Sequence, residues 1–450
     1  MKEKYQSIYK ELVQAYYEGR FEETFAKLLN KEFKNKEEAK EVLAILCGVE
    51  SDLAVDDAFY IQEIVQSITS QRVREKIVQK VRNCSTDCET VDGKSKCQTV
   101  CPFDAIMSSE DGKTKWIDDD LCMSCGRCVN ACDSGNYLET PQFLPLAQLF
   151  KQNEKVVAIV APAIAGQFGK DITLDQLREA FIKVGFTDML EVAAAADILS
   201  IKEALEFDAH VHKQGDFMIT SCCCPMWVAA LRKVYHDLVP NVSPSVSPMI
   251  AMARLVKAIN PEVKVVFIGP CIAKKAEAKE PDLKGDVDFV LTFQETKLIF
   301  DALGIDVMAC KGLPSVDYAA TGGRLYARTG GVSQAVWDIV DQLLPEKRKL
   351  FSALQVDGMK ECKSLLEDIE QGKARASFIE GMGCKGGCVG GPKAIIPAAE
   401  GREAVNEMAY ESSIRIPVHS EVLLGLLDKI DIHSYRELMD KHSMFERSFK

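Results

Sequence analysis

The distribution of cysteine constrains this chain more than any other feature of its sequence. Fourteen of its 17 cysteines are clustered: eight lie in one segment of about 50 residues, three are consecutive, and three stand in short loops rich in glycine or proline. The chain has 450 residues and begins without the apolar stretch of a secretory signal, so a disulfide framework is not expected. Clustered cysteines in a reducing, cytoplasmic setting indicate metal binding.

Composition and charge exclude other classes of protein. The formal net charge is −12, whereas a nucleic-acid or anionic-membrane surface needs a basic face. No apolar run approaches the ~20 residues that span a bilayer. No glycine-rich nucleotide fingerprint follows a predicted strand, so a direct reaction with NADH in this chain is not expected.

The pattern of the chain predicts three units. Residues 1–80 have apolar side chains at helical spacing, as at Tyr5, Ile8, Leu12 and Tyr16, and predict helices with a packing and docking role. Residues 81–140 are rich in cysteine and turns and predict a small ferredoxin-like α+β domain. In residues 141–450, buried strands alternate with helices, which predicts an α/β domain of parallel sheets with flanking helices and a site at the carboxyl ends of strands.

The cysteine-rich segment holds two sets of four cysteines. Its second half has the C-x2-C-x2-C-x3-C spacing of bacterial ferredoxins, in which the fourth cysteine ligates the other cluster. Two paired C-x2-C units could also form a zinc ribbon, but eight cysteines in two halves that share ligands favour two 4Fe–4S clusters. The first half has looser spacing. By the sharing rule, one cluster takes Cys84, Cys88, Cys97 and Cys132, and the other takes Cys101, Cys122, Cys125 and Cys128.

Three further cysteine loops each follow a predicted strand. Because the carboxyl ends of parallel strands meet in one crevice, these distant loops can build one site. Four thiolates would hold another cubane there, and the glycines of the third loop would let the backbone approach it closely. The loops are Thr220-Ser221-Cys222-Cys223-Cys224-Pro225, Gly269-Pro270-Cys271-Ile272-Ala273-Lys274 and Met382-Gly383-Cys384-Lys385-Gly386-Gly387-Cys388.

In this order, and behind a two-cluster segment, these loops resemble the signature loops of the FeFe-hydrogenases. The resemblance covers about residues 81–430. It implies an H-cluster, in which a 4Fe–4S cubane is joined through a cysteine sulfur to a diiron unit carrying carbon monoxide, cyanide and an azadithiolate bridge. Matched loop by loop, the cubane ligands are Cys224, Cys271, Cys384 and Cys388, and Cys388 is also the bridge to the diiron unit.

The same resemblance implies roles for other residues. Cys223 matches the thiol that passes protons to the bridging amine, Lys274 the lysine that holds one cyanide, and Met382 the methionine beside the diiron unit. The alternatives are a surface lysine and an ordinary packing methionine. Glu203 and Glu206 match two proton-relay glutamates at an i,i+3 spacing, with Ser243 between them and His210 where the family commonly has arginine. The alternative is that both glutamates are solvated helix residues.

The chain also departs from the family pattern. Gly269 stands where methionine usually precedes the second-loop cysteine, Met249 replaces a glutamine, and Ala161-Pro162-Ala163 has alanine where a serine often contacts a cyanide. The third loop ends in Gly390-Gly391-Pro392 with fewer glycines than usual. Cys222 occupies a position that is serine in most relatives. It is either a packing substitution or a loosening of the turn that lets the Cys223 sulfur reach an oxidised iron and block oxygen.

The resemblance implies a ferredoxin-linked enzyme that interconverts protons and hydrogen, fed by electrons through the two accessory clusters. Its partners would be ferredoxin or a similar small redox protein and the enzymes that mature the diiron unit. A hydrogen sensor with the same cofactor and a hydrogenase-like iron–sulfur assembly protein are the alternatives. A plain electron carrier would not need some 300 further residues.

Overall fold

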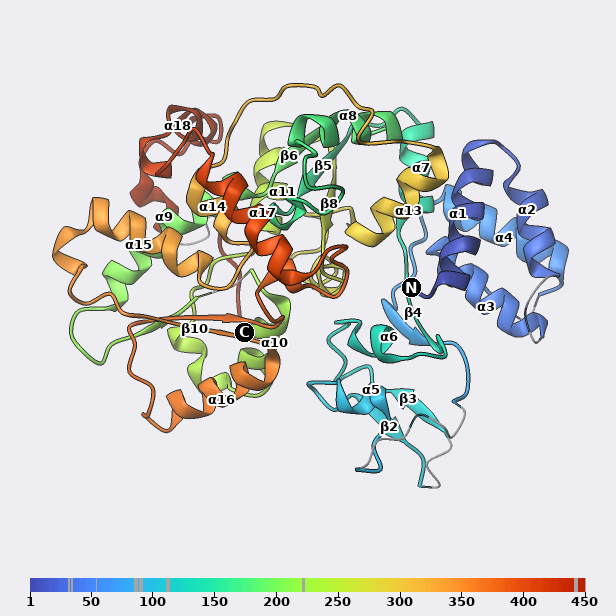
Figure 1. Cartoon of the computed structure of the whole chain (residues 1–450), viewed down its shortest axis with the longest axis horizontal. Coiled ribbons are helices and arrows are strands. Elements are labelled where there is room, and N and C mark those ends of the chain that lie inside the picture. The colour runs from blue at the N-terminus through green and yellow to red at the C-terminus, as the bar shows by residue number, and fades with distance from the viewer. Residues whose placement is uncertain are drawn as a thin grey trace.

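The structure is a computed structural model, and it describes residues 1–30, 33, 35–53, 55–84, 88, 92–110, 114–220, 223–440 and 444–449. Figure 1 shows an N-terminal group of helices and a small cysteine-rich domain beside a larger α/β domain. The predicted fold class is thus confirmed for the described residues.

Four helices form the N-terminal group. They are α1 (Glu3–Tyr17), α2 (Phe21–Leu29), α3 (Lys36–Cys47) and α4 (Asp57–Thr69). The predicted apolar stripe of α1, including Tyr5, Ile8 and Leu12, is buried. This helix packs against α13 (Phe293–Leu303) of the α/β domain, and α4 packs against α7 (Phe143–Lys151). The group is therefore docked on the large domain, as its apolar residues at helical spacing predict.

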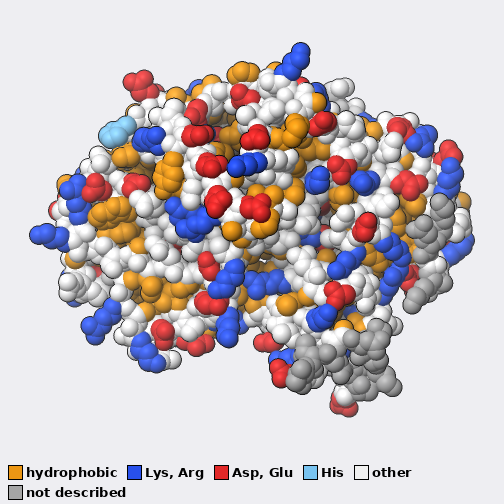
Figure 2. All heavy atoms as spheres, in the orientation of Figure 1, with side chains coloured by type: hydrophobic (Ala, Val, Ile, Leu, Met, Phe, Trp, Pro, Cys, Tyr) orange, Lys and Arg blue, Asp and Glu red, His pale blue; other side chains and the backbone are white. Residues whose placement is uncertain are grey.

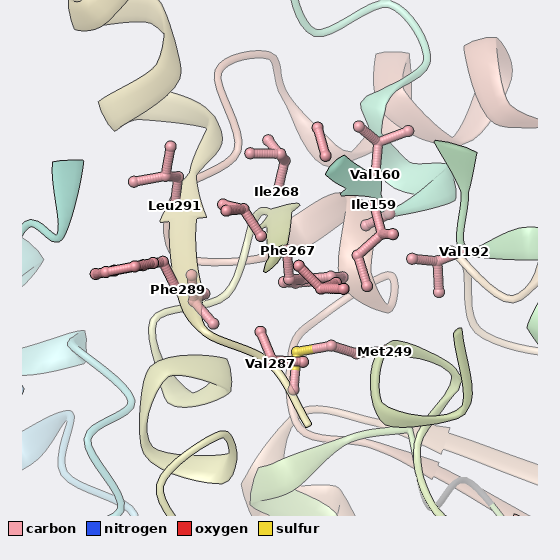
Figure 3. Close-up of a cluster of buried hydrophobic side chains, with 14 of the residues drawn as sticks. Ile159, Val160, Val192, Met249, Phe267, Ile268, Val287, Phe289 and Leu291 are labelled. Atoms are coloured by element: carbon pink, nitrogen blue, oxygen red, sulfur yellow. The ribbon is translucent and has the colours of Figure 1, made fainter. Parts of the chain in front are cut away.

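A four-stranded parallel sheet forms one half of the large domain, in the order β6-β5-β8-β9. The strands are β5 (Val156–Val160), β6 (Asp188–Glu191), β8 (Lys264–Gly269) and β9 (Phe289–Thr292). All of β5 is buried, which explains its unbroken apolar sequence. Figure 3 shows part of the core around this sheet, with Met249 and Val287 below Phe267. Helices α8 (Leu174–Val184) and α11 (Pro248–Ile259) accompany the sheet, and α8 has a capping box at Thr173 and its C-cap at Gly185.

A second parallel sheet has three strands in the order β10-β11-β7. These are β7 (Met218–Ile219), β10 (Ala353–Asp357) and β11 (Phe378–Met382). The first and third cysteine loops follow β7 and β11, while the second follows β8 of the other sheet. The crevice that the sequence predicts thus lies between two sheets. The remaining helices of the domain are α9 (Ala193–His210), α10 (Pro225–Lys233), α12 (Ala273–Glu277), α14 (Thr321–Leu325), α15 (Gly331–Leu343), α16 (Met359–Glu370), α17 (Ala398–Tyr410) and α18 (Glu421–Asp428).

The cysteine-rich domain combines two antiparallel strand pairs with two short helices. It contains β1 (Val78–Lys80) paired with β4 (Tyr137–Glu139), β2 (Ile106–Ser108) paired with β3 (Lys115–Ile117), α5 (Lys96–Thr99) and α6 (Arg127–Ala131). Gly126 packs directly on Ile272 of the second cysteine loop, and a Cβ added at Gly126 would lie 2.1 Å from the Ile272 side chain. Ile272 belongs to the hydrophobic core of the cysteine-rich domain. The two domains therefore share a core at this point.

Charges of both signs are interspersed over the face of the molecule in Figure 2. Among the described helices, none is both long and apolar enough to cross a membrane.

Candidate active site

The first cysteine loop lies between β7 and α10. Ser221 and Cys222 lie outside the described residues, so the prediction for Cys222 stays a prediction. Cys223 is buried, and Cys224 is the N-cap of α10, which begins at Pro225. The Cys224 Sγ accepts a hydrogen bond of 3.2 Å from the amide N–H of Gly383 in the third loop.

The four predicted cubane ligands lie near one another and are each partly buried. Burial, followed by the neighbouring Cys224 and Cys388, raises the pKa of the Cys271 thiol to about 12. Burial, with Cys224 next in effect, likewise raises the pKa of Cys388 to about 12, and the pKa of Cys384 is raised well above its ordinary value. Such thiols stay protonated at neutral pH until a metal binds. Because metal ligation requires the thiolate, occupation of this site would release protons.

Glycines of the third loop pack closely against other backbone atoms of the protein, and their approach to a cubane stays a prediction. Gly387 has a φ of +90°, in the region that favours glycine, and a Cβ added there would lie 2.7 Å from the Thr329 nitrogen. At Gly390 an added Cβ would lie only 1.9 Å from the carbonyl oxygen of Lys385. These two positions explain why the loop around Cys384 and Cys388 needs glycine.

A cavity of about 50 Å³ lies beside Cys388. It brings together three residues that the sequence assigns to the diiron unit, namely Cys223, Lys274 and Cys388. Two places at which the chain departs from the family pattern, Met249 and the segment Ala161-Pro162-Ala163, also line it. The rest of the lining consists of Val192, Ala196, Pro248, Phe267, Tyr326 and Ala327.

Lys274 is buried in the wall of this cavity, so the alternative of a surface lysine is wrong. Its Nζ lies 2.7 Å from Glu277 Oε2, but the angles at that contact are not those of a hydrogen bond. Burial lowers the pKa of Lys274, but Glu277 and the nearby thiols outweigh burial and raise it. The lysine thus presents a positive charge and N–H donors, as an anionic ligand such as cyanide would require.

Met382 ends β11 and is buried, but it is not part of the lining of this cavity. Its carbonyl oxygen accepts hydrogen bonds from the Gly358 amide and the Cys362 thiol. The structure thus places Met382, the first residue of the third loop, in a packing environment, and its contact with a diiron unit stays a prediction.

Both predicted relay glutamates are buried in α9, each about 1% exposed, so the alternative of solvated helix residues is wrong. The hydroxyl of Thr220, the first residue of the first cysteine loop, donates to Glu203. The Ser243 hydroxyl donates to Glu206 across 2.6 Å. His210 does not meet the Glu206 carboxylate, because its Nδ1 contacts the Glu206 main-chain carbonyl at 2.8 Å instead.

The sequence analysis did not predict two charged residues near the Glu206 carboxylate. Lys202 is fully buried and donates to Glu206, and it also pairs with Glu446 near the end of the chain. A signal for Lys202 was available, because α9 is apolar around most of its circumference. A lysine in such a helix is buried and must find a charged partner. Glu446 gave no signal, since 244 residues separate it from Lys202.

The eight remaining predicted ligands line two separate cavities in the cysteine-rich domain. One is lined by Cys101, Cys122, Cys125 and Cys128, and the other by Cys84, Cys88, Cys97 and Cys132. In the part of the chain that the structure describes, no three Cys, His, Asp or Glu side chains converge closely enough for a single metal ion. Thiols grouped around a hollow suit a cubane better than a zinc ion, which draws four sulfurs to about 2.3 Å.

A sequence model described as the C-terminal domain of the iron-only hydrogenase large subunit matches residues 154–392. This range contains all three cysteine loops and the cavity that they enclose. The chain belongs to the iron-only (FeFe) hydrogenase family. As a member, it carries the metal-binding, iron–sulfur character of these oxidoreductases.

Relatives of known name include both hydrogenases and assembly factors. The chain is 27% identical over 366 residues to the NADP-reducing hydrogenase subunit HndD of Solidesulfovibrio fructosivorans, covering 69% of this chain and 62% of that protein. It is 29% identical over 295 residues to the periplasmic iron hydrogenase large subunit of Nitratidesulfovibrio vulgaris. That match covers 54% of this chain and 69% of that protein. It is 22% identical to the cytosolic Fe-S cluster assembly factor narfl of Xenopus tropicalis, in a match that covers 72% of this chain and 81% of that protein.

A solved structure has the same fold. A variant of the FeFe-hydrogenase HydA1 from Chlamydomonas reinhardtii superposes with a TM-score of 0.53 at 22% identity, over 61% of this chain and 89% of that one.

Proposed function

We propose that this protein catalyses the reversible reaction 2H⁺ + 2e⁻ ⇌ H₂ at an H-cluster. The observation that carries the proposal is the single cavity lined by Cys223, Lys274 and Cys388. These residues come from three loops, and the resemblance assigns them a proton carrier, an anion-holding lysine and the cysteine that bridges cubane and diiron unit. When bound, the H-cluster would supply the electrons and the metal site at which protons and hydrogen interconvert.

The protein's own residues would hold and insulate that group. Cys224, Cys271, Cys384 and Cys388 would bind the cubane, and the Gly383 amide would stabilise the Cys224 thiolate by donating to its sulfur. The buried Lys274 ammonium would bind an anionic ligand. Apolar walls around the cavity, including Pro162, Met249 and Phe267, would exclude water.

Proton movement is assigned to Cys223, Glu203, Ser243 and Glu206. The sequence resemblance orders them, and the hydrogen bond from Ser243 to Glu206 joins two neighbours in that order. Glu203 is tied to the first cysteine loop by the Thr220 hydroxyl. Buried carboxyl groups joined by hydroxyl groups can pass protons between solvent and a buried base. We place Cys223 at the inner end because it is the member of this set that lines the cavity.

Electrons are proposed to enter through two 4Fe–4S clusters in the cysteine-rich domain. The cavity lined by Cys101, Cys122, Cys125 and Cys128 lies next to Gly126, which packs on the second loop of the large domain. The donor or acceptor is proposed to be ferredoxin or a similar small redox protein, and the diiron unit is proposed to need dedicated maturation enzymes.

A role in iron–sulfur assembly is the second candidate, because the match to the narfl assembly factor covers 81% of that protein. Such a protein would bind cubanes without a diiron unit. The buried Lys274 and the cavity beside Cys388 favour the hydrogenase, since a protein that holds cubanes alone has no use for either. A slow hydrogen sensor would share the whole site and differ only in turnover.

Infrared spectroscopy tests the proposal. After expression with the maturation enzymes of the family, the protein should show bands of metal-bound carbon monoxide and cyanide, and it should evolve hydrogen with a reduced dye. A matured preparation without such bands would exclude both the hydrogenase and the sensor. Bands with very slow hydrogen evolution would favour the sensor.

A further inference from the structure

A buried lysine stands at the outer end of the predicted proton path. The Nζ of Lys202 is fully buried and has three partners: the Glu206 carboxylate, Glu446 Oε1 at 3.1 Å and the Ser245 hydroxyl at 3.2 Å. An ammonium group has three N–H donors, so these acceptors saturate it. Burial lowers the pKa of Lys202, but Glu206 and Glu446 outweigh burial and raise it, so the group is an ammonium ion.

Glu446 is delivered to this lysine by a C-terminal strap, which we define as residues 444–449. The strap pairs with residues 244–246 through two backbone hydrogen bonds of 2.9 Å, from Val246 N to Phe445 O and from Arg447 N to Pro244 O. Its Phe445 side chain is fully buried, and Arg447 is anchored by ion pairs to Glu280 and Asp282. Glu446 lies opposite Ser245 in this pairing, so its carboxylate is fixed beside Lys202.

The charges of the cluster formed by Lys202, Glu206 and Glu446 allow it to take up one additional proton. Two carboxylates face one ammonium: Glu206 comes from α9 itself and Glu446 from the strap, while the segment before α11 contributes the hydroxyls of Ser243 and Ser245. The ionised cluster therefore has a net charge of −1, which uptake of one proton would neutralise. The Glu446 side chain is 24% exposed, whereas that of Glu206 is 2% exposed. Solvent protons therefore reach Glu446 first.

We propose that Glu446 is the solvent-side end of the proton path and that Lys202 links it to Glu206. A proton from solvent binds the Glu446 carboxylate. It moves to Lys202 as the ammonium releases one of its own protons to Glu206, so Lys202 is unchanged and Glu206 gains one proton. The path then continues through Ser243. His210, whose ring faces a main-chain carbonyl, has no part in it. This inference rests on the proposed hydrogenase function.

The test compares four variants of the matured, full-length protein with the parent: Glu446→Gln, Glu446→Asp, Glu280→Gln and His210→Ala. Glu280→Gln is the matched control, because it removes a carboxylate that also anchors the strap but is not joined to Lys202. Hydrogen evolution is measured with a reduced dye from acid to alkaline pH, with and without added imidazole as a small proton carrier. Infrared bands of bound carbon monoxide check that the metal site is intact.

Glu446→Gln should lose on the order of 10²-fold in rate at neutral and alkaline pH, the lower end of what a positioned proton carrier contributes. The loss should shrink in acid and on adding imidazole, and Glu446→Asp should recover most of the rate. Glu280→Gln and His210→Ala should stay near the parent. A Glu446→Gln protein that is as fast as an active parent, or a His210→Ala protein as slow as Glu446→Gln, would overturn the inference. An inactive parent without carbon monoxide bands would overturn the proposed function instead.

A second readout does not need the diiron unit. In protein expressed without maturation enzymes, infrared difference spectra between acid and neutral pH report protonation of carboxyl groups. Because Glu446 and Glu206 both contact the Lys202 ammonium, loss of one carboxyl group should change the infrared frequency of the other. Glu446→Gln should therefore remove one carboxyl signal and shift the frequency of a second, which Glu206→Gln should abolish. Loss of one signal with no frequency shift elsewhere would contradict the link through Lys202.

Discussion

The amide nitrogen of Gly383 lies 3.2 Å from the sulfur of Cys224 and donates a hydrogen bond to it. The two residues are 159 positions apart and belong to the third and first cysteine loops. A backbone N–H directed at a sulfur ligand stabilises the thiolate and shifts the potential of the cluster that it holds. This contact therefore links the packing of two loops to the redox properties of the proposed cubane.

Iron content should separate the stages of assembly. Three 4Fe–4S clusters and a diiron unit correspond to about 14 iron atoms per chain, and to about 12 when the maturation enzymes are absent. We expect the second preparation to make no hydrogen. Iron analysis and a hydrogen assay on both preparations test this, and hydrogen production by the unmatured protein would contradict the assignment.

Replacing Cys223 by alanine should stop proton delivery without removing a ligand. Turnover should fall about 10²–10⁴-fold because the inner proton carrier is lost, while the infrared bands of the diiron unit remain recognisable. Cys47→Ala is a matched control, since Cys47 is also a buried thiol but lies in α3 of the N-terminal helices. Loss of the bands in Cys223→Ala would show that this sulfur binds iron.

Glu206→Gln should slow both hydrogen evolution and hydrogen oxidation, because an amide cannot carry a proton as a carboxyl group does. The expected loss is about 10²-fold or more. Ser243→Ala removes only the 2.6 Å hydrogen bond to Glu206 and should have a smaller effect, since water can replace a hydroxyl. Near-normal turnover in Glu206→Gln would indicate a different proton route in this branch of the family.

Cys222→Ser tests whether the extra cysteine protects the enzyme from oxygen. If the looser turn lets the Cys223 sulfur cover an oxidised iron, the parent should lose activity reversibly during an oxygen pulse at oxidising potential. The serine variant should then lose it permanently. Protein-film electrochemistry records both in one experiment. Identical, permanent loss in the two proteins would leave packing as the role of Cys222.

The free energy of unfolding should decrease as the pH rises towards the pKa of Asp197 in the folded protein. Burial raises the pKa of this carboxyl from 3.8 to about 7, although the amides of Ala320 and Gly323 donate to its oxygens. Between about pH 4 and pH 7 the folded state holds a proton that the unfolded state has lost. The contribution of Asp197 is therefore fully present below pH 4 and is lost as pH rises to about 7.

Denaturant unfolding at several pH values measures this effect. Asp197→Asn cannot titrate, so its free energy of unfolding should change less over that pH range than that of the parent. Parallel pH profiles for the two proteins would show that Asp197 titrates at its ordinary value.

Local patterns predicted much of the fold, because the information lies close together in the chain. The Thr173 capping box, the buried run at Val156–Val160 and the stripe of α1 each depend on neighbours within a few turns. The division of the cysteine loops between two sheets depends on strand pairing across more than a hundred residues, which periodicity does not encode. Lys202 and Glu446 meet for the same kind of reason, through a strap whose partner segment begins 200 positions earlier.

The junction between the cysteine-rich domain and the catalytic domain limits how such proteins can be recombined. The Arg127 side chain donates to the Gly383 carbonyl at 2.6 Å, and the neighbouring Gly126 packs on Ile272, so one turn of the cysteine-rich domain supports the second and third cysteine loops. A chimera that takes this domain from another protein would still have the eight cysteines of the domain. It would lose the contacts that support the second and third cysteine loops. Exchange of accessory domains by gene fusion would therefore succeed only when the residues at positions 126, 127 and 272 are inherited together.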